Sequence, residues 1–289
     1  MFRFILQISA SVCILLFWMI LNDIVLQPNA IKKTLEGSES VKHVILGDSH
    51  AERIWISDAI NLAVGGAPLH TQALLLKVCS SRFTHLQSVI VSVGPHNFSN
   101  LAEDRILNNA DNYLSGNASR LAMINDVFDQ TPSNHYKIRQ LVGELLFPQA
   151  FPVQLSEPPQ VKTSDLNIER TLHRLKSDQV LSKNWFNATG TSAQAIWHLS
   201  DWSVTRDFCP IWFVGTPLHR SYLDSVEADG YQKYTDFLRQ VSREEHLHYV
   251  SLEAASLPDS FYLDADHLNV RGIHWIADTL ERVICSSRQ

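Results

Sequence analysis

The sequence predicts an α/β fold in which helices cover both faces of a parallel β-sheet. Short apolar runs that end in polar or Gly-containing turns alternate along the chain with segments of helical periodicity. Continuous apolar runs are typical of parallel strands, because such strands are buried on both sides. The chain has 289 residues, 45% of them hydrophobic, which is enough apolar mass for a sizeable core.

Four apolar runs predict the strands of this sheet, and they lie within 41–48, 88–99, 209–219 and 246–252. Helical periodicity follows or separates them, at 49–64, 224–246 and 270–286. Parallel sheets of this type bind ligands at the carboxyl ends of their strands. Three of the four runs end there in a small polar or Gly-containing turn, so we expect the chemistry to be collected at that edge.

The first residues differ from the rest. Residues 1–26 are apolar from Phe4 to Leu21, with only three polar interruptions, and about 20 such residues cross a bilayer as a helix. No convincing small-x-small cleavage site follows, which favours an uncleaved membrane anchor over a cleaved signal peptide or a buried core helix. Residues 27–42 read as a tether, and residues 43–289 as the folded domain.

Charge distribution limits the partners and the location. The net charge of −6 and the absence of a basic face argue against a nucleic-acid partner. Arg3 argues for an amino terminus in the cytoplasm, whereas Lys32 and Lys33 behind the apolar segment argue for the reverse orientation. We expect a single-pass membrane protein with its domain in the periplasm or outside the cell.

Residues 101–203 interrupt the alternation of strands and helices. They read as a helical insertion around a Pro-rich loop near Pro148 to Pro159. A loop region of this length suits a lid or a wall that faces the substrate. A peripheral scaffold with no part in the chemistry is the alternative.

The cysteine pattern and the missing cofactor motifs predict chemistry by side chains alone. Cys13 lies in the apolar segment, which leaves Cys79, Cys209 and Cys285 for at most one intramolecular disulfide or for buried thiols. Neither a CxxC pair nor a Cys/His zinc spacing is present. The Gly-Thr-Pro turn lacks the lysine of a nucleotide-binding loop. We therefore expect no metal and no organic cofactor.

A serine and a distant Asp-x-x-His pair are the candidate catalytic groups. Ser49 follows the first predicted strand in Gly-Asp-Ser-His, and Asp264 and His267 precede the last predicted helix. A serine hydroxyl attacks only when a base takes its proton, and that base is usually a histidine oriented by a carboxylate. The alternatives are that Ser49 only caps a helix and that Asp-x-x-His is a surface turn.

Acyl transfer also needs donors that face the developing oxyanion. The turn after the second predicted strand offers His96 and Asn97, and a backbone amide is available at Gly65 or Gly66. His50, next to Ser49, either lines the pocket or is simply a satisfied histidine.

In chain order, Gly-Asp-Ser-His, Asn61 with the following Gly-Gly, Gly-Pro-His-Asn and Asp-x-x-His resemble the four sequence blocks of the SGNH (GDSL-type) hydrolase superfamily. The resemblance implies a three-layer α/β/α fold with a flavodoxin-like sheet. It also implies that Ser49 is the nucleophile and that Asp264 and His267 are acid and base. The oxyanion hole would comprise the Ser49 amide, Gly66 and Asn97. Since the third block departs from the usual Gly-x-Asn-Asp, His96 is the alternative donor.

The anchor and the pattern Asp-x-Asp-His-Leu-Asn resemble the SGNH domains of bacterial envelope acylation systems. That likeness implies an esterase or O-acyltransferase for acyl, chiefly acetyl, esters of an extracytoplasmic polysaccharide, working beside a membrane-bound acyltransferase. A general esterase or lipase on small or lipid esters is one alternative. A non-catalytic SGNH-like partner in polysaccharide export is another.

Overall fold

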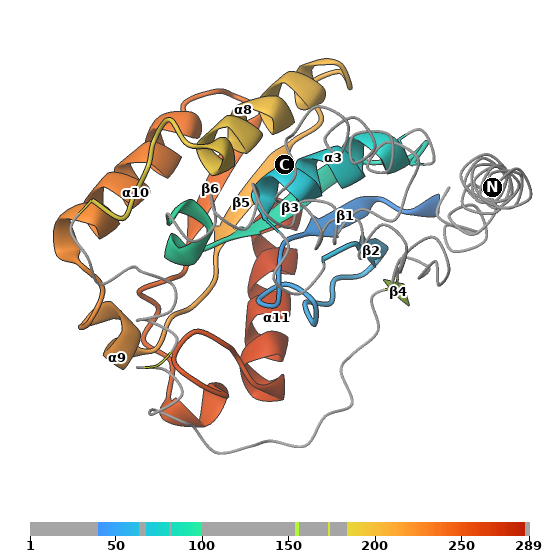
Figure 1. Cartoon of the computed structure of the whole chain (residues 1–289). Helices are drawn as coiled ribbons and strands as arrows, with labels where there is room; N and C mark the ends of the chain where they lie inside the picture. Colours follow the sequence, from blue (N-terminus) through green and yellow to red (C-terminus); the bar gives the residue numbers. More distant parts are fainter. Residues whose placement is uncertain are drawn as a thin grey trace, which may run out of the picture. The chain divides into compact units, whose positions relative to one another are not determined.

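The computed structural model describes residues 40–63, 68–80, 83–99, 154–155, 173 and 184–286 (Figure 1). The predicted anchor at 1–26, nearly all of the tether at 27–42 and most of the predicted insertion at 101–203 lie outside these residues. No helix in the described ranges is both long and apolar enough to span a bilayer. The anchor, the tether and the limits of the insertion therefore stay predictions.

The described strands form one six-stranded sheet, ordered β4-β2-β1-β3-β5-β6. Every neighbouring pair is parallel except β2 and β4. The predicted α/β fold with a parallel sheet is confirmed, and each of the four expected runs contains a strand. The strands are β1 (His43–Leu46), β2 (Ala59–Asn61), β3 (Ser88–Val93), β4 (Gln154–Leu155), β5 (Ile211–Gly215) and β6 (Leu247–Ser251).

Helices follow the strands and pack against the sheet. The longer ones are α3 (Leu69–Cys79), α8 (Thr191–Val204), α10 (Ala228–Val241) and α11 (Val270–Ser286). Short turns of helix are α9 (Arg220–Leu223), η4 (Pro95–Phe98) and η6 (Asp259–Phe261). The helical periodicity at 224–246 and 270–286 is confirmed by α10 and α11.

The core forms because side chains on a strand alternate between the two faces of the sheet. Ile45, Ile90 and Val214 belong to one buried cluster with Ile276 and Leu280 of α11. Helix α11 therefore covers one face. On the other side of the sheet, α3 packs on α8, α8 contacts β5, and α10 contacts β6 (Figure 1).

The strand order places one crevice at the edge where chemistry is expected. From β1 the chain moves outward to β2, and it then crosses to β3 on the opposite side of β1. In open parallel sheets such a reversal leaves a crevice outside the carboxyl ends of the two central strands, where ligands bind. Here those ends are followed by the turn after β1 and by η4 after β3.

The expected helix at 49–64 is wrong. The chain forms turns directly after β1 and then adds β2 as a parallel neighbour of β1. Asn61 holds the turns in place, because its side-chain amide donates to the carbonyl oxygens of Ala51 and Ile54 at 2.8 and 3.0 Å. Asp58 adopts a positive φ of 56°, which a helix does not allow. Short apolar runs fit both helical and strand spacing, so periodicity could not separate the two.

The cysteine question is settled at one position. Cys209 is a buried free thiol, so it is not part of a disulfide. The side chains of Cys79 and Cys285 lie outside the described set.

Candidate functional site

The turn after β1 presents Ser49 at the sheet edge. Gly47 makes the turn possible because its φ is +145°, and a Cβ there would come within 2.8 Å of the Cβ atoms of Ala51 and Ser92. The turn is closed by the Ala51 amide, which donates to the carbonyl of Asp48 at 3.0 Å. Since turns and not a helix follow Ser49, the alternative that Ser49 caps a helix is wrong.

The loop before α11 presents His267. Asp264 Oδ1 accepts a hydrogen bond from the His267 backbone amide at 2.9 Å, which bends the loop around the carboxylate. The Asn269 side chain fixes the end of the loop, because its amide donates to the Ser260 carbonyl and its oxygen accepts from the Arg271 amide. The motif Asp-x-Asp-His-Leu-Asn is thus a loop with its own internal bracing.

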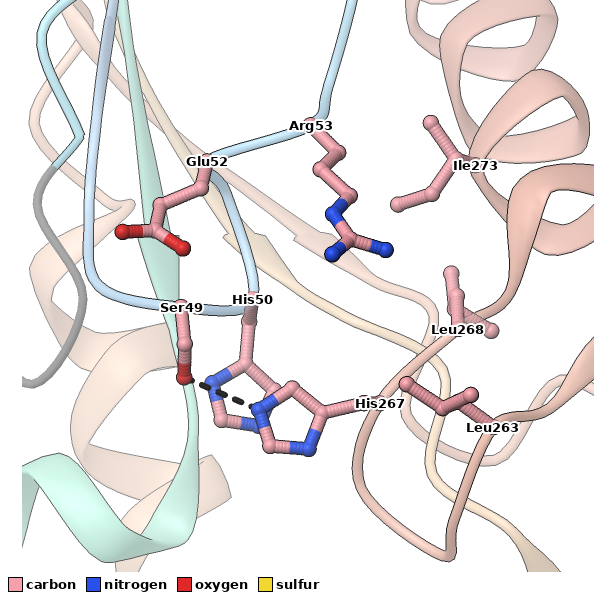
Figure 2. A pocket seen from close by; sticks show the side chains of 8 residues that line it. All are labelled: Ser49, His50, Glu52, Arg53, Leu263, His267, Leu268 and Ile273. Atoms are coloured by element: carbon pink, nitrogen blue, oxygen red, sulfur yellow. Dashed lines mark hydrogen bonds between the residues drawn. The ribbon is translucent and has the colours of Figure 1, made fainter. Parts of the chain in front are cut away.

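The structure brings Ser49, Asp264 and His267 together. Ser49 Oγ lies 2.9 Å from His267 Nε2, although the two residues are 218 positions apart (Figure 2). On the other side of the ring, His267 Nδ1 lies 2.9 Å from Asp264 Oδ1. A carboxylate accepts but does not donate, so Nδ1 carries the hydrogen and Nε2 offers its lone pair to the serine hydroxyl.

The predicted oxyanion donors are only partly described. Gly65 and Gly66 lie outside the described residues. Asn97 and His96 sit on η4, where the Asn97 side chain donates to Asp48 Oδ2 at 2.9 Å and His96 Nε2 contacts the same oxygen at 2.5 Å. An amide nitrogen carries two hydrogens, so Asn97 retains one beyond the hydrogen given to Asp48. The assignment of the third donor stays a prediction.

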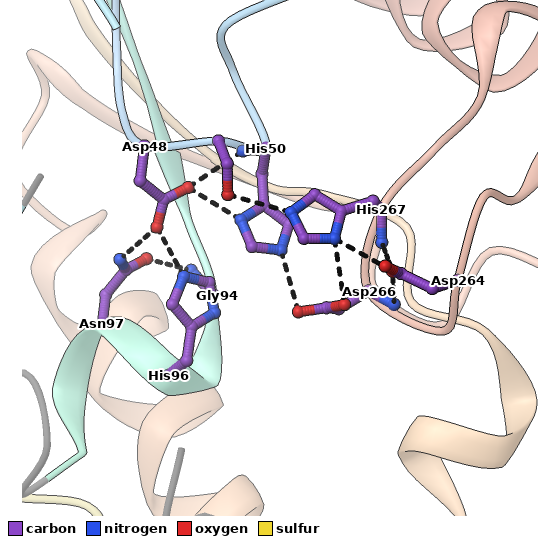
Figure 3. A network of polar contacts seen from close by, with 9 residues as sticks. Asp48, His50, Gly94, His96, Asn97, Asp264, Asp266 and His267 are labelled. Carbon is purple, nitrogen blue, oxygen red and sulfur yellow. Dashed lines mark hydrogen bonds and ion pairs between the residues drawn. The ribbon is translucent and has the colours of Figure 1, made fainter. Parts of the chain in front are cut away.

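Asp48, which follows β1, accepts hydrogen bonds from the turn that follows β3 and so connects the ends of these two strands (Figure 3). Besides Asn97 and His96, it accepts from the backbone amide and the ring Nδ1 of His50, at 3.0 and 2.7 Å. Burial alone would raise the pKa of Asp48, but the imidazoles of His50 and His96 hold it well below its usual range. Asp48 is therefore a buried carboxylate that stays charged.

Asp266 was included in the Asp-x-Asp-His-Leu-Asn pattern, but it was assigned no role from the sequence. Its Oδ1 lies 3.1 Å from His267 Nδ1, and its Oδ2 lies 3.4 Å from His50 Nε2. Although burial would raise the pKa of Asp266, the two imidazoles hold it well below its usual range. The only signal available was its place directly before His267. His50 lines the pocket and also hydrogen-bonds to Asp48, so the two alternatives given for it from the sequence do not exclude each other.

Within the described part of the chain, two sets of side chains have metal-ligand chemistry, Asp48 with His50 and His96, and His50 with Asp266 and His267. Two ligands of a tetrahedral metal lie roughly 3.3 Å apart, given bonds of about 2.0–2.1 Å. In the first set the pairs are 2.7 and 2.5 Å apart, which are the distances of a shared proton. In the second set, His267 Nδ1 is already hydrogen-bonded to Asp264 Oδ1 at 2.9 Å, so this nitrogen has no lone pair to offer a metal ion. Both sets are better described as a proton and charge network.

A cavity of about 220 Å³ opens beside the Ser49 hydroxyl (Figure 2). Leu263 and Ile273 contribute apolar surface to it, and Glu52 and Arg53 contribute charged groups. A substrate carbonyl in this cavity would lie next to both Ser49 and His267. The arrangement can therefore carry out nucleophilic attack with general-base assistance.

Comparison of the whole chain with models of known protein families and with curated proteins finds no match to either.

Proposed function

We propose that the chain is a serine esterase or O-acyltransferase of the SGNH type, acting on acyl esters, chiefly acetyl esters, of an extracytoplasmic polysaccharide. One observation carries the proposal. Ser49 Oγ lies 2.9 Å from His267 Nε2, and His267 Nδ1 lies 2.9 Å from Asp264. A nucleophile, a base within reach of its proton and a carboxylate that orients the base are the parts that acyl transfer needs.

The first half of the reaction transfers the acyl group to Ser49. Ser49 Oγ attacks the ester carbonyl while His267 Nε2 takes the hydroxyl proton, and the carbonyl oxygen gains a negative charge. When the tetrahedral intermediate collapses, the bond to the alcohol oxygen breaks and His267 returns the proton to that oxygen. Asp264 stabilises the imidazolium in between.

The second half of the reaction releases the acyl group. Water, or a sugar hydroxyl in a transferase, attacks the acyl-Ser49 carbonyl while His267 takes the attacking proton. Collapse returns that proton to Ser49 Oγ. The proposed oxyanion donors in both halves are the Ser49 amide, the Gly66 amide and Asn97, with His96 as the alternative.

The cavity favours a short acyl group over a long lipid chain. Its volume of about 220 Å³ is smaller than the pockets of about 300–1,000 Å³ that hold drug-sized ligands. The charged groups of Glu52 and Arg53 at the cavity are also better suited to a hydrated glycan than to a lipid tail. Both features support the glycan ester over the general lipase.

The strand order gives further support to the SGNH assignment. Numbered in chain order, the five parallel strands lie 2-1-3-4-5, which is the flavodoxin-like order. In this proposal the apolar residues 1–26 anchor the domain at the outer face of a membrane. A membrane-bound acyltransferase that supplies or accepts the acyl group is the expected partner.

Ser49→Ala tests the proposal. The purified full-length chain, kept in mild detergent, is assayed with p-nitrophenyl acetate and labelled with a fluorophosphonate probe. We expect wild type to turn over the ester and to carry the label on Ser49. Ser49→Ala should lose about 10³-fold or more in kcat/KM and all specific labelling, because no nucleophile remains.

Ser57→Ala is the matched control, since Ser57 lies in the same segment but donates to Glu281 on the surface. It should retain wild-type turnover and labelling. Equal rates for wild type and Ser49→Ala, without label on Ser49, would contradict an enzyme. Full support of polysaccharide modification in cells by Ser49→Ala would favour the non-catalytic partner.

A further inference from the structure

The ring of His50 is enclosed by two histidine rings and two carboxylates of the site (Figure 3). Its ring stacks on the ring of His267, with centroids 4.5 Å apart and planes 10° apart, and its other face stacks on His96 at 4.4 Å. Nδ1 lies 2.7 Å from Asp48 Oδ1, and Nε2 lies 3.4 Å from Asp266 Oδ2. The side chain is only 2% exposed.

Both ring nitrogens of His50 therefore face carboxylate oxygens. A neutral imidazole has one N–H and one lone pair, and a lone pair that faces a carboxylate is repelled. Only the doubly protonated ring presents a hydrogen on each side. The geometry itself thus favours a cationic His50.

We propose that His50 is a positioning residue that balances charge: its imidazolium, held between Asp48 and Asp266, offsets the carboxylates around His267 and so limits the protonation of His267, the base. The proposal rests on the proposed function, in which His267 is that base. It assigns to His50 a role that acts through His267 and not on the substrate.

The need for such a residue follows from the surroundings of His267. Asp264 and Asp266 lie 2.9 and 3.1 Å from its Nδ1, and each negative charge favours the protonated ring. A base that is already protonated at the working pH cannot take the proton of Ser49. The stacked His50 is the group in this network that opposes the two carboxylates.

The titration directions agree with this balance. Burial lowers the pKa of His50, but Asp48 and Asp266 outweigh it and raise the pKa to about 10. Burial also lowers the pKa of His267, Asp264 and Asp266 raise it, and the His50 charge lowers it, with a net rise. His96 faces His50 on the side away from His267, and Glu52 and Arg53 are the charged groups at the cavity.

His50→Gln removes the positive charge and keeps a side chain that can bond to Asp48. We expect the pKa of His267, followed by NMR in the full-length chain with ¹³C-labelled histidine, to rise by about one unit. In the ester assay the acid limb of kcat/KM should move up equally. A shift of one unit lowers kcat/KM about tenfold at pH values below the pKa of His267, and much less at higher pH.

Asp266→Asn is the second variant, and it should shift His267 in the opposite direction. Loss of a carboxylate 3.1 Å from Nδ1 should lower the pKa of His267 by about one unit. The control is His248→Gln, which removes a stacked histidine elsewhere: His248 lies on Trp212, with centroids 4.2 Å apart. It should leave the His267 titration and the pH profile unchanged.

Opposite shifts in the first two variants would support the charge balance, because loss of packing alone cannot change sign. An unchanged or lowered pKa of His267 in His50→Gln would overturn it. If His50→Gln does not fold, Asp266→Asn decides: an unchanged or raised His267 pKa overturns the proposal. The NMR titration needs no turnover, so it still reports on His50 if the esterase proposal itself fails.

Discussion

Two buried carboxyl groups lie just beyond strand ends of the same sheet, and their surroundings are opposite. Asp48 follows β1 and is 5% exposed, and Glu253 follows β6 and is fully buried. Asp48 accepts from imidazoles and from the Asn97 amide. Glu253 accepts from three hydroxyl groups, those of Tyr234, Tyr249 and Ser251.

The ionisation of the two groups differs accordingly. The imidazoles beside Asp48 overcome the effect of burial and hold its pKa well below the usual range. Burial dominates at Glu253, and its pKa is raised although three hydroxyls donate to it. Neutral donors do not compensate for lost hydration of a charge as a cation does. Burial alone therefore does not decide whether a carboxyl group carries charge.

This difference separates a region built for chemistry from one built for packing. The Glu253 cluster joins α10 to β6, because Tyr234 lies on the helix and Tyr249 on the strand. The Asp48 cluster joins two strand ends to the loop of His267, and it does so with charges that respond to protonation. Variants of the groups around His267 should accordingly change the rate strongly, and variants of the Glu253 cluster should leave it nearly unchanged.

The largest expected difference is in turnover. Asp264→Asn should lower kcat/KM for p-nitrophenyl acetate on the order of 10³-fold, because His267 loses the carboxylate that fixes its tautomer and stabilises its imidazolium. Glu253→Gln should change it only a few-fold, since the Glu253 cluster does not contact Ser49 or His267. Steady-state kinetics of both full-length variants measures this, and comparable losses would remove the distinction between the clusters.

The next difference is in the free energy of unfolding. Asp48→Asn should cost about 3 kcal/mol, because it leaves the His50 cation without its closer carboxylate and turns an amide donor toward other donors. Glu253→Gln should cost about 1 kcal/mol, since the amide oxygen can still accept from two hydroxyls. Urea denaturation at neutral pH compares the two. An equal or greater cost for Glu253→Gln would contradict the expected difference between the two clusters.

Much of the fold could be predicted because its signals are local. The strands β1, β3 and β5 are mainly apolar and fully buried, β6 is a less apolar and less buried strand, and α11 has a regular apolar face. Strand β2 was missed because it has only three residues, and so short a segment fits the spacing of a helix as well as that of a strand.

The candidate site divides in the same way. Ser49, Asp264 and His267 stand in short motifs at a strand end and before a helix, so their positions could be predicted. The charge network could not be predicted. Asp48 contacts His96, which is 48 positions away, and His50 contacts Asp266 only once the loop has folded. Which carboxylate faces which imidazole is decided by tertiary contacts alone.

The third expected difference is the alkaline loss of stability that comes from His50. Its folded pKa of about 10 lies above the unfolded value of about 6.5, so the folded state binds its proton more tightly. The stabilisation is fully present below pH 6.5 and is lost as the pH rises through 10, at up to about 1.4 kcal/mol per unit. His267 contributes in the same direction, since its pKa is also raised. Urea midpoints at pH 7, 8 and 9 should therefore fall in wild type and fall less in His50→Gln. The same decline in both proteins would mean that His50 carries no proton in the folded state, and the contrast between Asp48 and Glu253 would lose its cause.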